Sequence, residues 1–156
     1  ALRALAHTDC AERARVLADF YQQWNNDPLV IDKWFIVQAT ASLPDSLGHI
    51  EKLLQHEAFD IKVPNRVRSL IGVFSQSNPV IFHDKSGAGY RLLADCVIKL
   101  NQLNPQIAAR LLLPLIQWKR YDESRQVLMK EQLNRIAALP DIARDVFEIV
   151  SKGLSQ

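Results

Sequence analysis

Long apolar runs, cysteines and an excess of either charge are all scarce in this sequence, and each shortage excludes a class of protein. No stretch approaches the roughly 20 consecutive apolar residues that cross a bilayer, so we expect no membrane partner. Nineteen basic residues nearly balance 17 acidic residues, for a formal net charge of +2. Proteins that bind nucleic acid concentrate basic residues on one face, so we expect no nucleic-acid partner. At 156 residues, 48% of them hydrophobic, the chain is expected to form one domain, 1–156.

The two cysteines, Cys10 and Cys96, are far apart in sequence and have no metal-ligand spacing. Isolated thiols are typical of a reducing compartment, where a buried Cys behaves as a small apolar residue. We therefore expect a cytoplasmic protein with two free thiols. A single disulfide between them is the alternative.

Apolar residues recur at helical spacing along almost the whole chain, and the period-two alternation of strands is absent. Proline and asparagine interrupt the pattern, and Pro at the first position of a helix sacrifices no hydrogen bond. These breaks predict a helix after Asp9 that ends at Asn25, a short turn over 78–82, and helices that begin at Pro28, Pro44, Pro64, Tyr90, Pro105, Asp122 and Pro140. Pro114 is expected to bend the helix that begins at Pro105.

Each expected helix has one apolar side, and these sides predict the core. Three of these sets are Val16, Leu17, Phe20, Tyr21 and Trp24 in the first helix; Val67, Leu70, Ile71 and Phe74 after Pro64; and Val146, Phe147, Val150 and Leu154 in the last. Short connections favour antiparallel neighbours. The predicted fold is therefore all-α, a superhelix of stacked antiparallel helix pairs, armadillo- or HEAT-like, with eight or nine helices.

Candidate chemistry is sparse. The fragment His56-Glu57-Ala58-Phe59-Asp60 has Asp where the zinc helix of a metallopeptidase has its second histidine. His49 and His56 share a helix face, but no third metal ligand follows at a suitable spacing. We expect no catalytic residue and no metal site, so nothing in this chain alone marks it as an enzyme.

The turn Ser86-Gly87-Ala88-Gly89 precedes a helix, as a phosphate-binding loop does. It lacks the Lys-Ser/Thr pair with which such a loop ends. Gly87 and Gly89 are expected to provide a positive φ or a close approach of two backbones. Asp84, beside His83, is expected to cap this turn rather than to act as an acid or base.

One helix carries an unusual polar side. Gln106, Arg110, Leu113 and Gln117 fall together opposite the apolar stripe of the helix that begins at Pro105. From spacing alone an ordinary solvated face is favoured. On the helix after Pro64, Arg68 shares a side with the small residues Gly72 and Ser75, which would let another backbone come close.

Several segments resemble the C-terminal domain of bacterial aminopeptidase N, a zinc metallopeptidase of the gluzincin type. They are Asn78–Tyr90, with its Asn-Pro start and glycine turn; Asn104–Leu111, which reads Asn-Pro-Gln-Ile-Ala-Ala-Arg-Leu; Trp118–Asp122; and Val146–Lys152. The resemblance extends more weakly over essentially the whole chain. It implies a non-catalytic domain of a larger enzyme that removes N-terminal residues from peptides, with zinc held by an upstream catalytic domain.

The resemblance also implies site residues and partners. Gln106 and Arg110, from the Asn-Pro-Gln-x-Ala-Ala-Arg motif, and Arg68, from a neighbouring helix, would line the internal substrate cavity. The partner would be the chain's own catalytic domain, with short peptides entering the cavity between them. The alternative is a free-standing α-solenoid scaffold that binds another protein through its concave face.

Overall fold

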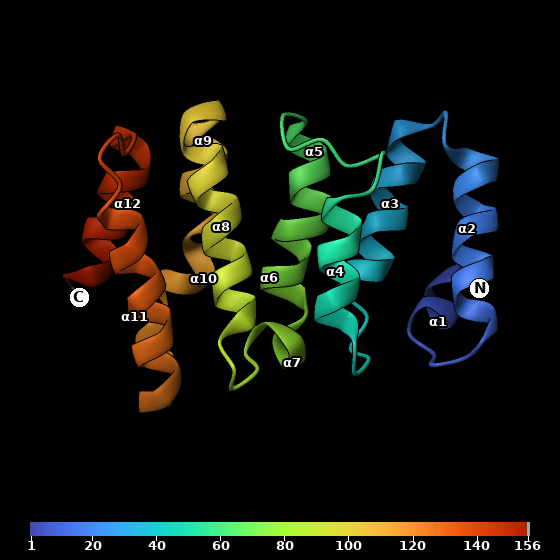
Figure 1. Ribbon diagram of the computed structural model, residues 1–156, viewed down its shortest axis with the longest axis horizontal. Coiled ribbons are helices and arrows are strands. Elements are labelled where there is room, and N and C mark those ends of the chain that lie inside the picture. Colours follow the sequence, from blue (N-terminus) through green and yellow to red (C-terminus); the bar gives the residue numbers. More distant parts are fainter. Residues whose placement is uncertain (156) are drawn as a thin grey trace. The chain divides into compact units, whose positions relative to one another are not determined.

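The computed structural model describes residues 1–155, and these residues contain helices and no strand. They form two compact units, Ala1–Ile81 (unit 1) and the part from Phe82 onward (unit 2). Within each unit the longer helices run up and down in alternation (Figure 1). None of the described helices is long and apolar enough to cross a membrane.

Unit 1 is organised around α3, Pro28–Ala39, which packs against α2, Glu12–Trp24, and α4, Ser46–Leu54. Asp27 starts α3 by accepting hydrogen bonds from the backbone N–H groups of Leu29 and Val30, with Pro28 at the first helical position. A short α1, Leu2–Ala6, precedes α2 and contacts both α2 and α3. The side of α3 that faces its neighbours buries Ile31, Trp34 and Phe35.

A further continuous helical stretch lies in unit 1. It consists of α5, Pro64–Val67, a π-helical turn η1, Arg68–Gly72, and α6, Val73–Ser77, with η1 packed on α3. The four apolar residues predicted to face inward are all at most 1% exposed: Val67, Leu70, Ile71 and Phe74. The helix that begins at Pro64 is therefore confirmed, whereas the widened turn at η1 had no signal in the sequence.

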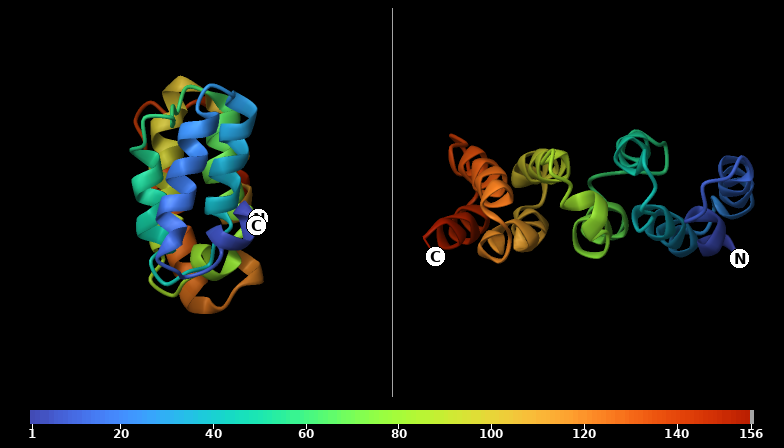
Figure 2. Two further views of the ribbon diagram at one scale, coloured as in Figure 1. Left: turned by 90° about the vertical axis from the view of Figure 1, so that its right-hand side faces the viewer. Right: turned by 90° about the horizontal axis from the view of Figure 1, so that it is seen from below.

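The short helix α7, Pro79–Phe82, confirms the predicted turn over 78–82. Unit 2 then follows with α8, Ala88–Leu103; α9, Pro105–Leu111; α10, Leu113–Ile116; a 3-10 turn η2, Trp118–Arg120; α11, Glu123–Ala137; and α12, Arg144–Leu154. The views in Figure 2 show the helices of each unit from the side and nearly end-on. The core of unit 2 includes Met129, Leu133 and Ile136 of α11, all 0% exposed.

Asparagine and proline act as predicted around α9. Asn104 accepts a hydrogen bond from the backbone N–H of Ile107 at 3.2 Å, and Pro105 occupies the first turn. The helix is interrupted at Leu112, two residues before Pro114, which separates α9 from α10. This break confirms the predicted bend.

Several details differ from the prediction. The short helix α1 was not expected, and the helix expected from Pro44 begins at Ser46. The helical segments number more than eight or nine, because breaks such as the one at Leu112 divide expected helices. Trp24 and Phe147, both predicted to face inward, are 41% and 52% exposed. Each lies at the edge of its apolar stripe, where periodicity defines burial least well.

The last helix begins at Arg144 rather than at Pro140. The buried side chain of Asn101 on α8 binds this segment: its Nδ2 donates to the Asp141 carbonyl at 3.0 Å, and its Oδ1 accepts from the Ala143 N–H at 2.8 Å. These bonds satisfy backbone groups that a helical turn would otherwise use. An irregular segment therefore replaces the first turn of the expected helix.

Candidate functional site

The side of α9 away from the core is the first candidate site. Gln106, Arg110, Leu113 and Gln117 are all exposed, whereas Ile107 and Leu111 on the opposite side are buried, as the spacing predicted. Gln106 and Arg110 lie one helical turn apart. Neither side chain makes a hydrogen bond or ion pair with any other residue that the structure describes, so the guanidinium of Arg110 keeps all its donors.

Arg68 lies in unit 1, in the π-helical turn. Its Nη1 donates to Asn65 Oδ1 at 3.0 Å. It borders a shallow hollow of about 280 Å³ together with Asp32, Ile36, Asn65, Ser69 and Val73. The neighbouring Arg66 already binds Asp32, with Nη1 2.5 Å from Oδ1. Arg68 is therefore the arginine at this hollow whose remaining N–H groups can bind a ligand.

His83 is held between two tyrosines that the sequence analysis did not connect to it. Its Nδ1 lies 2.8 Å from the hydroxyl of Tyr90, and its Nε2 lies 2.9 Å from the hydroxyl of Tyr121. Burial lowers the pKa of His83 and raises the pKa of Tyr90 to about 12. Both imidazole nitrogens are thus hydrogen-bonded to tyrosine hydroxyl groups, so His83 has a structural role.

The turn that follows His83 behaves as predicted. Asp84 Oδ1 accepts a hydrogen bond from the Ser86 N–H at 2.9 Å, and Gly87 has φ +69°. A Cβ on Gly89 would lie 2.5 Å from the carbonyl oxygen of Phe82. Gly87 therefore provides the positive φ and Gly89 the close backbone approach, and Asp84 caps the turn.

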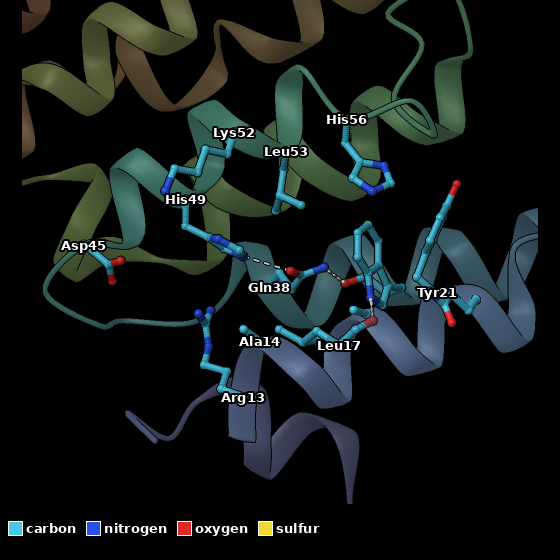
Figure 3. Close-up of a pocket in the computed structure, with 13 residues that line it drawn as sticks. Arg13, Ala14, Leu17, Tyr21, Gln38, Asp45, His49, Lys52, Leu53 and His56 are labelled. Carbon is cyan, nitrogen blue, oxygen red and sulfur yellow. Dashed lines mark hydrogen bonds between the residues drawn. The ribbon is translucent and has the colours of Figure 1, made fainter. Parts of the chain in front are cut away.

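The second candidate site is a groove of about 450 Å³ in unit 1 (Figure 3). Its two sides are α2 and α4, and α3 contributes Trp34 and Gln38. His49 and His56 both line this groove, but they do not share a helix as predicted, because α4 ends at Leu54 and His56 lies beyond it.

A chain of hydrogen bonds orients the inner wall of the groove. Trp34 Nε1 donates to the Leu17 carbonyl at 2.9 Å, and Gln38 Nε2 donates to the Trp34 carbonyl at 3.0 Å. Gln38 Oε1 must then accept from His49 Nε2, 2.8 Å away. The proton of this imidazole therefore lies on Nε2, which leaves Nδ1 of His49 as a hydrogen-bond acceptor.

His56 has the same tautomer. The backbone N–H of Ala58 donates to His56 Nδ1 at 3.1 Å, so the proton lies on Nε2. Burial lowers the pKa of both His49 and His56, assisted for His49 by the positive charge of Arg13. At neutral pH the groove therefore contains two uncharged imidazoles.

No group of three or more potential metal ligands occurs among residues 1–155. Both thiols are free, and burial raises the pKa of Cys96 to about 12. Cys96 is therefore a protonated packing residue rather than a nucleophile.

Comparison with known proteins gives concordant results. Residues 1–155 match a family model described as "Domain of unknown function (DUF3458_C) ARM repeats". The chain is 48% identical over 139 residues to a protein named aminopeptidase N from Haemophilus influenzae. The matched region covers 89% of this chain and 16% of that protein. It is 41% identical over 158 residues to aminopeptidase N from Escherichia coli. This match covers 99% of this chain and 18% of that protein.

A solved structure is also similar. The crystal structure of Legionella pneumophila aminopeptidase A in complex with aspartic acid matches with a TM-score of 0.92 and 37% sequence identity, covering 99% of this chain and 18% of that chain. The ARM-repeat description agrees with the armadillo-like architecture expected from the sequence. The chain spans less than a fifth of the length of each of these relatives.

Proposed function

Because this chain belongs to the DUF3458_C family of ARM-repeat domains, found in aminopeptidases, we propose that it forms a wall of the substrate chamber of an aminopeptidase N. The remainder of that enzyme supplies the zinc and the catalytic groups. The domain packs on the catalytic part of its own polypeptide and restricts entry to short peptides. Its cytoplasmic location, also proposed, is supported by the two free thiols.

The observation that carries the proposal is the exposed pair on α9. Gln106 and Arg110 sit on a helix whose opposite side is firmly anchored in the core, and they have no partner among the described residues. An arginine fixed on a rigid helix presents several donors to peptide carbonyl groups or to a terminal carboxylate. Such a pair can hold the distal part of a peptide while its N-terminal residue is cleaved elsewhere.

Arg68 provides a second cation for the same purpose. One of its nitrogens binds Asn65, which fixes the side chain and leaves its other donors for a ligand. Arg68 lies in a π-helical turn, and such turns are often found at functional sites.

The length of the natural polypeptide is the first test. The proposal requires upstream sequence with the His-Glu-x-x-His zinc helix, since the only His-Glu pair here, His56-Glu57, is followed by Asp60. A native product little longer than 156 residues would refute it and favour the free-standing scaffold.

The second test is kinetic and uses the intact enzyme. Arg110→Ala should raise KM for peptides of about five or more residues several-fold, because a distal contact of about 1 kcal/mol is lost. The value of kcat and the cleavage of dipeptides should change little. Arg91→Ala, which removes another exposed arginine from unit 2, is the matched control. An unchanged profile over all peptide lengths would exclude Arg110 from the chamber.

A further inference from the structure

The groove between α2 and α4 has two chemically different ends. Arg13, Asp45 and His49 lie at one end, and Tyr21 and His56 lie at the other (Figure 3). Helical spacing explains the separation, since Arg13 and Tyr21 are eight residues apart on α2, or about 12 Å along the axis. One end therefore carries charges, and the other is aromatic.

The charged end contains both signs. Arg13 uses its Nε to donate to the Ala6 carbonyl at 2.9 Å, which fixes the guanidinium and leaves its terminal nitrogens free. Asp45 precedes α4 but makes no capping hydrogen bond with its side chain. Lys52 also lines the groove. None of these three groups forms an ion pair with another described residue.

The aromatic end is preformed. The ring of Tyr21 lies 5.1 Å from that of Trp34 and 4.7 Å from that of His56, between centroids. Trp34 is held by its hydrogen bond to Leu17, and Tyr21 donates to Glu57 at 3.0 Å. Rings fixed in this way offer edges and faces to another aromatic group without further ordering.

We propose that this groove binds the zwitterion of an aromatic amino acid. The carboxylate pairs with the Arg13 guanidinium and the Lys52 ammonium, and the ligand's ammonium pairs with Asp45 and the free Nδ1 of His49. The ligand's ring lies against Tyr21 and its neighbours. A cavity of about 450 Å³ is within the range of small-molecule sites. This site is separate from peptide cleavage and does not depend on the proposed function.

The ligand's two charges are both needed to match the groove. A simple carboxylate would leave Asp45 facing another anion, and a simple amine would face Arg13 and Lys52. Each mismatch of a partly exposed pair should weaken binding about threefold to fivefold. For a ligand of this size we expect a dissociation constant of about 1–3 mM.

The test is a ¹⁹F NMR titration of the intact protein with 4-fluoro-L-phenylalanine. Ala18→Trp fills the groove from an exposed position of α2, and Gln23→Trp places the same side chain on the same helix outside the groove. We expect Ala18→Trp to abolish the groove-bound fraction and Gln23→Trp to retain it. Equal binding by wild type and Ala18→Trp, or equal loss in both variants, would overturn the proposal.

Selectivity provides a readout that does not depend on filling the groove. L-Phenylalanine should displace the probe better than 3-phenylpropionate, which lacks the ammonium, and better than phenethylamine, which lacks the carboxylate. Asp45→Asn should reduce the preference over 3-phenylpropionate about threefold, and Lys52→Gln should do the same for phenethylamine. If 3-phenylpropionate binds wild type as well as L-phenylalanine does, the zwitterion is not the ligand.

Discussion

Two glycines in helices should respond in opposite ways to the same substitution. Gly48 lies within α4, and a Cβ built there meets no atom within 4 Å. Gly89 lies in the first turn of α8, is buried, and its Cβ would meet three backbone atoms of Phe82 at 2.5, 2.9 and 3.1 Å. Only Gly87 among the described glycines has a positive φ, so alanine is conformationally allowed at both positions.

The magnitudes follow from two opposing effects. Replacing a helical glycine by alanine stabilises the helix by about 0.5–1 kcal/mol, and Gly48→Ala should show this gain in full. Overpacking costs about 1–3 kcal/mol, and Gly89→Ala should reach the upper part of that range because the clashing Phe82 atoms are backbone. The expected net change is a loss of about 2 kcal/mol.

Urea unfolding followed by circular dichroism would measure both free energies of unfolding. In a thermal experiment a chain of this size shifts its midpoint by about 2–4 °C per kcal/mol. Gly48→Ala should raise the midpoint and Gly89→Ala should lower it. A Gly89→Ala protein as stable as wild type would show that α8 does not approach Phe82 so closely, and the account of the glycine turn would be wrong.

Three other perturbations have defined outcomes. Tyr90→Phe leaves a nitrogen of half-buried His83 without its partner, so the free energy of unfolding in urea should fall by about 1–2 kcal/mol. Asn101→Ala removes the acceptor of the Ala143 N–H, and hydrogen exchange at that amide should accelerate together with a loss of about 1–3 kcal/mol in stability. For His49 the folded pKa lies below the ordinary value, so the stabilisation by the neutral form is complete above about pH 6.5 and declines as pH falls through the folded pKa. The unfolding free energy of His49→Gln, measured from pH 7.5 to 5, should therefore fall less on acidification than that of wild type.

Local sequence signals were sufficient for most helix starts. Asp27-Pro28 and Asn104-Pro105 combine a capping side chain with a proline that requires no donor, and both start helices where predicted. Pro114 was likewise enough to predict a break, since the missing N–H acts on its own helix. These features depend on residues within a turn of one another, which a single sequence displays directly.

Features that depend on distant residues were missed. The delayed start of α12 results from Asn101, 40 residues before Asp141, and nothing in the local sequence at Pro140 reveals this competition. Tyr121 reaches His83 across 38 residues. An asparagine or tyrosine on an apolar helix is compatible with many partners, so the choice is made only when the helices pack.

The two candidate sites also differ in whether they depend on one helix or on the packing of several. Periodicity alone placed Gln106 and Arg110 on the outer side of α9, because burial of the opposite stripe is a property of one helix. The groove needed three helices, since Arg13, Trp34 and His49 come from α2, α3 and α4. The tautomer of His49 depends on Gln38, whose amide orientation is set by the Trp34 carbonyl. The donor and acceptor pattern of the groove is thus a property of packing. Gln38→Leu removes the acceptor that fixes the proton on His49 Nε2, so in the ¹⁹F displacement titration it should reduce the preference for L-phenylalanine over 3-phenylpropionate, with α2 and α4 still helical.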